Sequence, residues 1–239
     1  MPYNNGQTMT LRAPGGHRIK VRLEVNAKAR RLIIRLDERR REAVAVAPSR
    51  GQIQAAAAFA AERVDWISSR LQHLPDVVRF EEGAVFNYRG EPCQITGEGD
   101  GRLARLIAGE PRTLCAPGDP ETLDLRVERF LKKQARADLT RAVKRHCETL
   151  GVEYKGISVK DTRSRWGSCT FDGQLSFSWR LVMAPPAVLD YVAAHECAHL
   201  IEMNHSNKFW ALVGKCCPDW KRQRAWLRVH GAELQAAGE

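Results

Sequence analysis

Two histidines and a glutamate fall at a spacing that suits metal chemistry. His195 and His199 are four residues apart, so on an α-helix their imidazoles lie one turn apart on the same face and can hold one metal ion. Glu196 lies on the neighbouring face, where its carboxylate can reach a water molecule on the metal without being a ligand. This HExxH pattern is typical of zinc peptidases, in which the glutamate is the general base. It predicts a site for one zinc ion per chain.

A catalytic zinc site usually has three protein ligands and leaves a fourth position for water. His205 is the predicted third ligand, although it cannot continue the helical face of the motif. We therefore expect the chain to leave the helix after Met203, with Asn204, which tolerates the left-handed conformation, at the helix end. Two carboxylates compete with His205 for this role, those of Glu202 and Asp219. The spacing equals that of metzincins, but no methionine follows residue 203, which excludes the Met-turn of that class.

Four segments carry a resemblance to a known family: RSRWGSC (Arg163–Cys169), LSFSWRLVMAPP (Leu175–Pro186), DYVAAHECAHL (Asp190–Leu200) and NHSNKFW (Asn204–Trp210). With them the chain resembles the YgjP-like zinc metallopeptidases and, more distantly, SprT-like proteases. The resemblance implies a zincin-type metallopeptidase domain with Glu196 as the catalytic base. The implied zinc ligands are His195, His199 and His205. Ser178 departs from the family pattern, which usually has asparagine at that position.

Peptide hydrolysis also needs a donor that stabilises the oxyanion. The candidates are Arg163, Arg165 and Tyr191. Residues around the third histidine are expected to hold its imidazole in place, as second-shell partners do. These are Asn204, Ser206 and Trp210. The strand expected at 174–182, or its hairpin partner, is the natural edge for an extended polypeptide substrate.

The C-terminal half supplies the elements that must position these residues. A long amphipathic helix is expected over about 121–150, ended by Gly151 as a C′ glycine. Strands at 156–162 and 174–182 follow, with a hairpin turn at Asp172-Gly173. The Pro185-Pro186 pair opens the helix that carries the HExxH motif. Two short helices are expected at about 206–215 and 219–236.

The N-terminal half reads as β-rich. Alternating apolar residues predict strands at 18–25, 30–36 and 42–48 in a small antiparallel sheet, after about ten frayed residues. An amphipathic helix is expected over 52–74, and short apolar runs between glycine-rich turns predict a β-meander over 80–115. The PGDP turn at 117–120 is the expected boundary. The predicted organisation is therefore α+β, with a basic β-rich region at 1–118 and a zincin-like metallopeptidase domain at 119–239.

The composition of the chain indicates where in the cell the protein acts and which partners it could bind. The first twenty residues lack the apolar core of a signal peptide, and the longest apolar run is too short to span a membrane, so no membrane association is expected. Seven cysteines without a CxxC pair indicate reduced thiols in a cytoplasmic protein. The net charge of +10 is concentrated at 11–50 and 126–145. Such patches could bind nucleic acid, but a solvated arginine-rich surface is favoured because no DNA-binding motif is present.

The residues together predict a zinc metallopeptidase, a hydrolase that cleaves peptide bonds of a polypeptide substrate with a zinc-activated water and Glu196 as general base. Three alternatives remain open. The first is a DNA-associated protease of SprT-like type that uses the basic N-terminal region to bind DNA. The second is a non-catalytic zinc-binding protein with a closed four-ligand site. The third is hydrolysis of an amide that is not a peptide.

Overall fold

The structure, a computed structural model, describes residues 3–37, 40–162 and 165–238. It is an α+β protein and divides into two compact units, an N-terminal unit that ends at Asp76 and a C-terminal unit that begins at Val77. The boundary predicted from the sequence is 118/119. The structure has it earlier because the strands between Val85 and Cys115 belong to the core of the second unit. No helix among the described residues has both the length and the apolar character needed to cross a membrane.

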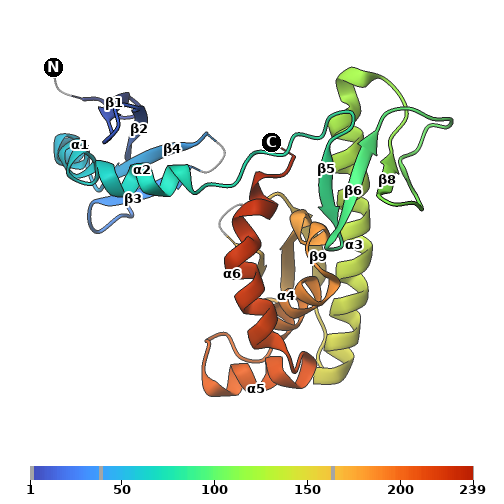
Figure 1. The fold of residues 1–239 in the computed structure, drawn as a ribbon. Coiled ribbons are helices and arrows are strands. Elements are labelled where there is room, and N and C mark those ends of the chain that lie inside the picture. Colours follow the sequence, from blue (N-terminus) through green and yellow to red (C-terminus); the bar gives the residue numbers. More distant parts are fainter. Residues whose placement is uncertain (1–2, 38–39, 163–164, 239) are drawn as a thin grey trace. The chain divides into compact units, whose positions relative to one another are not determined.

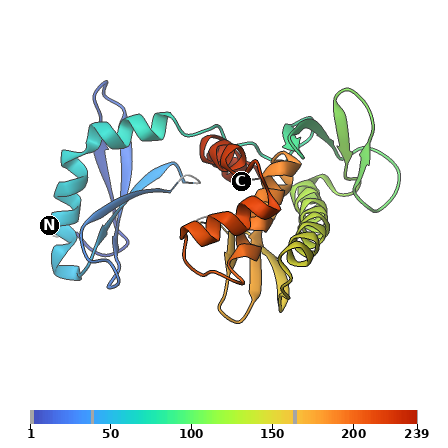
Figure 2. The ribbon, with the colours of Figure 1, turned by 90° about the horizontal axis from the view of Figure 1, so that it is seen from below.

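The N-terminal unit is a four-stranded sheet with helices along one side (Figure 2). Its elements are β1 (Thr8–Arg12), β2 (Arg18–Val25), β3 (Ile33–Asp37), β4 (Glu42–Ala47), the 3-10 turn η1 (Arg50–Gln52), α1 (Ile53–Glu62) and α2 (Val64–Gln72). The strand order is β1-β2-β4-β3. The core of the unit lies between the sheet and the helices, where Val21, Leu23 and Ala57 are buried.

Three expectations for this unit are corrected. The sheet is mixed, because β4 pairs in parallel with β2 and antiparallel with β3. Residues of the first ten form β1, whose Met9 is buried against the sheet. The helix expected over 52–74 is interrupted at Arg63, which leaves helical geometry between α1 and α2.

The C-terminal unit contains two small sheets. One has the order β5-β6-β8-β7 and is formed by β5 (Val85–Tyr88), β6 (Glu91–Thr96), β7 (Arg105–Ile107) and β8 (Arg112–Cys115). The other has the order β10-β11-β9 and is formed by β9 (Gly156–Lys160), β10 (Gly167–Cys169) and β11 (Gln174–Ser178). β10 and β11 form a hairpin at the predicted turn, where Gly173 has a positive φ. β10 is not among the predicted strands, and the predicted strand at 156–162 instead pairs in parallel with β11 as β9. β10 is one edge of its sheet.

Four helices complete this unit. They are α3 (Leu123–Leu150), α4 (Pro186–Ala198), α5 (Asn207–Cys216) and α6 (Trp220–Ala236). Of these, α3 and α4 contact the second sheet. α4 lies between α3 and α6, and its end leads toward α5 (Figure 1). Apolar residues at helical spacing, among them Val127, Leu131 and Leu139, are fully buried on α3. Gly151 ends α3 in the left-handed conformation, at a φ of 70°, which confirms the predicted glycine cap.

The segment before α4 differs from its prediction. β11 stops at Ser178, and residues Trp179–Met183 form the 3-10 turn η3 instead of continuing the strand. All five side chains of η3 are buried, so the strongly apolar run marks core and not an extended strand. α4 then begins at Pro186, as the proline pair predicts. A short 3-10 turn η2 (Pro120–Thr122) precedes α3 in a similar way.

Candidate metal centre

Three imidazoles converge at the end of α4. His195, His199 and His205 each offer a ring nitrogen, and these nitrogens lie within 4.8 Å of one another. The Nε2 atoms of His195 and His205 are 3.1 Å apart. The ring centroids of the three side chains are separated by 4.8 to 5.0 Å. The rings therefore surround one point.

The helix that carries the motif is shorter than expected. α4 ends at Ala198, and His199 is its C-terminal cap, still in right-handed helical geometry. The expectation that the helix runs to Met203 is therefore wrong, and Asn204 does not adopt a positive φ. The earlier end lets the chain turn within a few residues. His205 then lies immediately before α5, and its ring faces back to α4.

Hydrogen bonds around the third histidine hold this turn. The side-chain oxygen of Asn204 accepts a hydrogen bond from the backbone N–H of Ser206 at 3.0 Å. Ser206 is the N-cap of α5, and its hydroxyl accepts from the N–H of Phe209. The Trp210 ring lies 5.8 Å from the rings of both His195 and His205. The three predicted supporting residues thus lie around the loop, and within the described residues none of them forms a hydrogen bond with an imidazole.

The orientation of the imidazoles has two further causes. His199 Nδ1 lies 3.0 Å from the backbone carbonyl of Glu202, which fixes the proton on Nδ1 and leaves Nε2 as an electron-pair donor. The buried Phe209 ring lies 4.4 to 4.8 Å from all three imidazoles and forms an apolar floor. Burial, and then the neighbouring rings, lower the pKa of His195 to about 3. That imidazole is therefore neutral, as a metal ligand must be.

The donor set fits a zinc ion. Two nitrogens bound to one tetrahedral zinc at 2.0–2.1 Å would lie about 3.3 Å apart, close to the observed separation of 3.1 Å. Of the rival carboxylates, neither Glu202 nor Asp219 joins the group of candidate ligands formed by the described residues. Cys197 points elsewhere, with its sulfur 3.7 Å from the sulfur of Cys147 on α3. Three imidazoles are thus the described donors, and a fourth position is left for water.

Glu196 lies in a tight pocket beside the imidazoles. Its side chain is buried, with 5% of the residue exposed, and burial raises its pKa to about 8. A Cβ atom built at Gly167 of β10 would lie 2.5 Å from the Glu196 Oε1 atom and 2.6 Å from Cγ. Only a residue without a side chain fits there. The glycine of the WGSC segment is therefore a requirement of the carboxylate position, which sequence analysis does not reveal.

The oxyanion candidates fall into different environments. Arg165 is exposed, and its charge reaches Glu196, where it partly offsets the rise in pKa that burial causes. Tyr191 is buried, its ring lies 6.0 Å from the His195 ring, and burial raises its pKa to about 12. Arg163 lies outside the described residues. The geometry therefore keeps Arg165 near the carboxylate and gives Tyr191 mainly a packing position.

One basic residue near the site is not anticipated from the sequence. Arg224 of α6 places its guanidinium carbon 5.0 Å from the centre of the Trp210 ring. No local motif marks Arg224, because only the packing of α6 on α5 and α4 brings it to the imidazoles.

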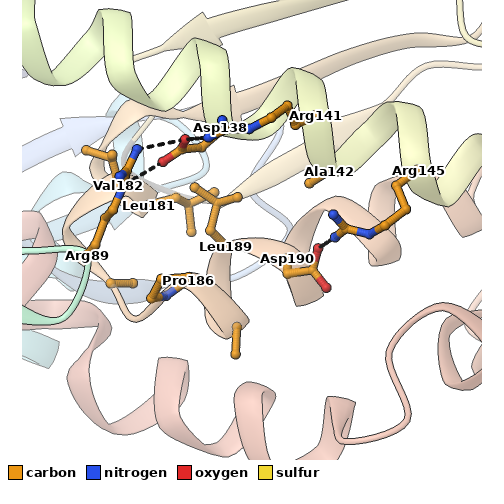
Figure 3. A pocket seen from close by; sticks show the side chains of 12 residues that line it. Arg89, Asp138, Arg141, Ala142, Arg145, Leu181, Val182, Pro186, Leu189 and Asp190 are labelled. Carbon is orange, nitrogen blue, oxygen red and sulfur yellow. Dashed lines mark hydrogen bonds and ion pairs between the residues drawn. The ribbon is translucent and has the colours of Figure 1, made fainter.

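A separate cavity of about 480 Å³ lies between α3, η3 and the start of α4 (Figure 3). Arg89 donates two hydrogen bonds of 2.9 Å to Asp138 there, and Arg145 pairs with Asp190. The residues that line it include none of the three histidines. Because its arginines face carboxylates, the charges of this cavity are largely satisfied within the protein.

One comparison with known proteins identifies a metallopeptidase family. The sequence model of one family, described as YgjP-like, metallopeptidase domain, matches residues 30–230. Among solved structures, the chain is similar to the metallopeptidase zymogen abylysin of Pyrococcus abyssi, with 19% sequence identity and a TM-score of 0.35. That match covers 39% of this chain and 92% of the other, and a similarity this low carries no argument. No curated protein matches the chain.

Proposed function

The chain belongs to the YgjP-like metallopeptidase family, and from this premise we propose that it is a zinc-dependent peptidase. In this proposal the zinc ligands are His195, His199 and His205, and Glu196 is the general base. The observation that carries the proposal is the convergence of three imidazole nitrogens on one point beside a buried carboxylate. We find no observation that favours a second function.

A catalytic site is favoured over a structural one by the donor count. Structural zinc is usually held by four protein ligands, whereas the described residues supply three. His205 is exposed, so the side of the site that it borders is open to solvent. Water and substrate can therefore reach the position that the protein leaves vacant among its donors.

Glu196 suits the role of proton carrier. A zinc ion held by the three imidazoles would lower the pKa of its water toward about 7 and polarise the scissile carbonyl. The Glu196 carboxylate then accepts the proton of the attacking water and delivers it to the leaving amine. Burial gives this carboxyl a high affinity for the proton, and Gly167 holds it in one position. In this proposal Arg165, whose charge reaches Glu196, supports the carbonyl oxygen.

The substrate in this proposal is an extended polypeptide. β10 is an edge strand, and it carries Gly167 against the catalytic carboxylate. A peptide that pairs with this edge would run past Glu196 and the imidazoles. All seven cysteines are free thiols, which supports a cytoplasmic setting.

The proposal is tested by metal removal and replacement. Purified protein should contain one zinc per chain and cleave casein, lose cleavage when the zinc is chelated, and regain it when zinc is added back. Zinc-loaded protein that cleaves neither casein nor a mixed peptide library would contradict the proposal.

A further inference from the structure

Two arginines lie near the metal centre, one before β10 and one on α6. Arg165 precedes β10 and reaches Glu196 with its charge. Arg224, on α6, lies over the Trp210 ring, which adjoins His195 and His205. Both arginines are exposed to solvent. A substrate in the site would therefore meet the positive charges of two guanidinium groups.

Aromatic stacking holds Arg224 in place. Trp210 and Trp220 are stacked, with ring centroids 4.2 Å apart and an angle of 16° between the planes. The Arg224 guanidinium carbon is 5.0 Å from the Trp210 centroid, and Lys221 Nζ is 5.7 Å from that of Trp220. In such cation–π contacts the aromatic ring attracts the cation over its face. The N–H edge of a stacked guanidinium stays available for two hydrogen bonds to a carboxylate.

The positive charge of Arg224 lowers the pKa values of side chains at the metal centre. Burial raises the pKa of Tyr191, and the Arg224 charge partly offsets that rise. The same charge adds to the lowering of the His195 pKa, which burial causes first. A guanidinium that acts on these side chains will also act on a substrate bound over them.

Neither arginine forms an ion pair within the part of the chain that the structure describes, although the Arg165 charge acts on Glu196. Elsewhere in the same unit arginines are paired: Arg89 with Asp138, and Arg180 with Asp161. Both guanidinium groups at the metal centre are thus free to form an ion pair with a group outside the protein. A carboxylate on the substrate is the partner whose geometry and charge match them.

We propose that Arg224 and Arg165 select substrates that carry aspartate or glutamate close to the scissile bond. This inference rests on the proposed peptidase function and names its substrate class, an acidic extended polypeptide. Residues of an extended strand are about 3.3 Å apart along the chain. Only one tryptophan ring separates Arg224 from the imidazoles. The substrate carboxylate that binds Arg224 should therefore lie within about three residues of the cleaved bond.

The test is a charge reversal read out as specificity. Zinc-loaded wild type and Arg224→Glu are incubated with a mixed peptide library, and the residues flanking each cleaved bond are identified by mass spectrometry. Wild type should favour Asp and Glu over Lys and Arg within three residues of the cut. In Arg224→Glu the ratio of acidic to basic flanks should fall by about tenfold, because an attraction becomes a repulsion. Arg165→Glu should shift the ratio in the same direction.

Three controls separate this effect from damage to the site. Arg222→Glu makes the same change of net charge on the same helix, about 200° around its axis, and should keep the wild-type ratio. Arg224→Lys should retain the acidic preference, and Arg224→Gln should lose it. Zinc content is measured for every variant.

Two results would overturn the inference while leaving the peptidase function intact. One is wild-type cleavage without a preference for acidic flanks. The other is an equal shift of the ratio in Arg222→Glu and Arg224→Glu. Zinc-loaded wild type that cleaves no bond would instead contradict the peptidase function, and this inference with it.

Discussion

The carboxylate of Glu196 lies so close to Gly167 that a methyl group at that glycine would come within 2.5 Å of its Oε1 atom. The two residues come from α4 and β10, which the sequence separates and the fold packs together. This contact sets the position of the proposed general base relative to the edge strand proposed to bind substrate.

Gly167→Ala should displace Glu196 and lower kcat for peptide cleavage by roughly tenfold to a hundredfold. The added carbon enters the space of a buried carboxylate that cannot swing away freely, and a misplaced base transfers protons poorly. Zinc content should not change, because Glu196 is not a proposed ligand. Gly214→Ala is the matched control, since its added carbon meets Trp220 at an ordinary 3.8 Å. Wild-type kcat in Gly167→Ala would contradict the proposed role of Glu196.

Removal of the metal should lower the melting temperature of the protein. An ion that binds the folded state alone stabilises it by about 2.7 kcal/mol when its concentration is 100 times the dissociation constant. Without the cation, the three neighbouring imidazoles also lose the ion that they bind in common. Differential scanning calorimetry with and without a chelator measures the shift. A melting temperature that chelation and zinc leave unchanged would argue against a bound ion.

His205→Ala should weaken zinc binding by at least about a hundredfold, which exceeds the usual effect of losing a second-shell partner. The variant removes one of three donors and leaves the site open on its exposed side. Competition with a zinc-binding dye gives the affinity. His230→Ala on α6, outside the cluster, should bind zinc like wild type. Full affinity in His205→Ala would move the third ligand to Glu202 or Asp219.

Ser206→Ala should destabilise the C-terminal unit by about 1 kcal/mol, because it removes the N-cap of α5. For a unit of this size the melting temperature should fall by about 2–4 °C. Because the cap fixes the loop that carries His205, zinc affinity should fall as well, by about tenfold. Ser206→Thr keeps a hydroxyl and should restore both. A loss of stability with unchanged zinc affinity would separate the cap from the metal site.

Local patterns predicted the features that depend on neighbours in sequence. The four-residue spacing of His195 and His199 needs only one helical turn, and Gly151 ends α3 because its own backbone conformation requires glycine. The proline pair before α4 and the turn at Gly173 are equally local. These parts of the fold and of the candidate site follow from backbone preferences alone.

Features that depend on distant packing were missed. The 118/119 boundary is displaced because β5 to β8 bury their apolar faces against α3, a partner that composition does not identify. The parallel pairing of β2 with β4 arises because β3 lies between them in sequence but outside them in the sheet. Gly167 and Arg224 reach the site from β10 and α6. No spacing rule links either residue to the HExxH motif.

The central claim is that Glu196 moves the proton while three histidines hold the zinc. It is tested most directly by measuring zinc content and casein cleavage together on Glu196→Gln, with Glu202→Gln, in the loop that follows α4, as the control. The account predicts one zinc per chain in both variants, cleavage reduced by about 10²- to 10⁴-fold in Glu196→Gln, and little change in Glu202→Gln. Cleavage at the wild-type rate by zinc-loaded Glu196→Gln would contradict it.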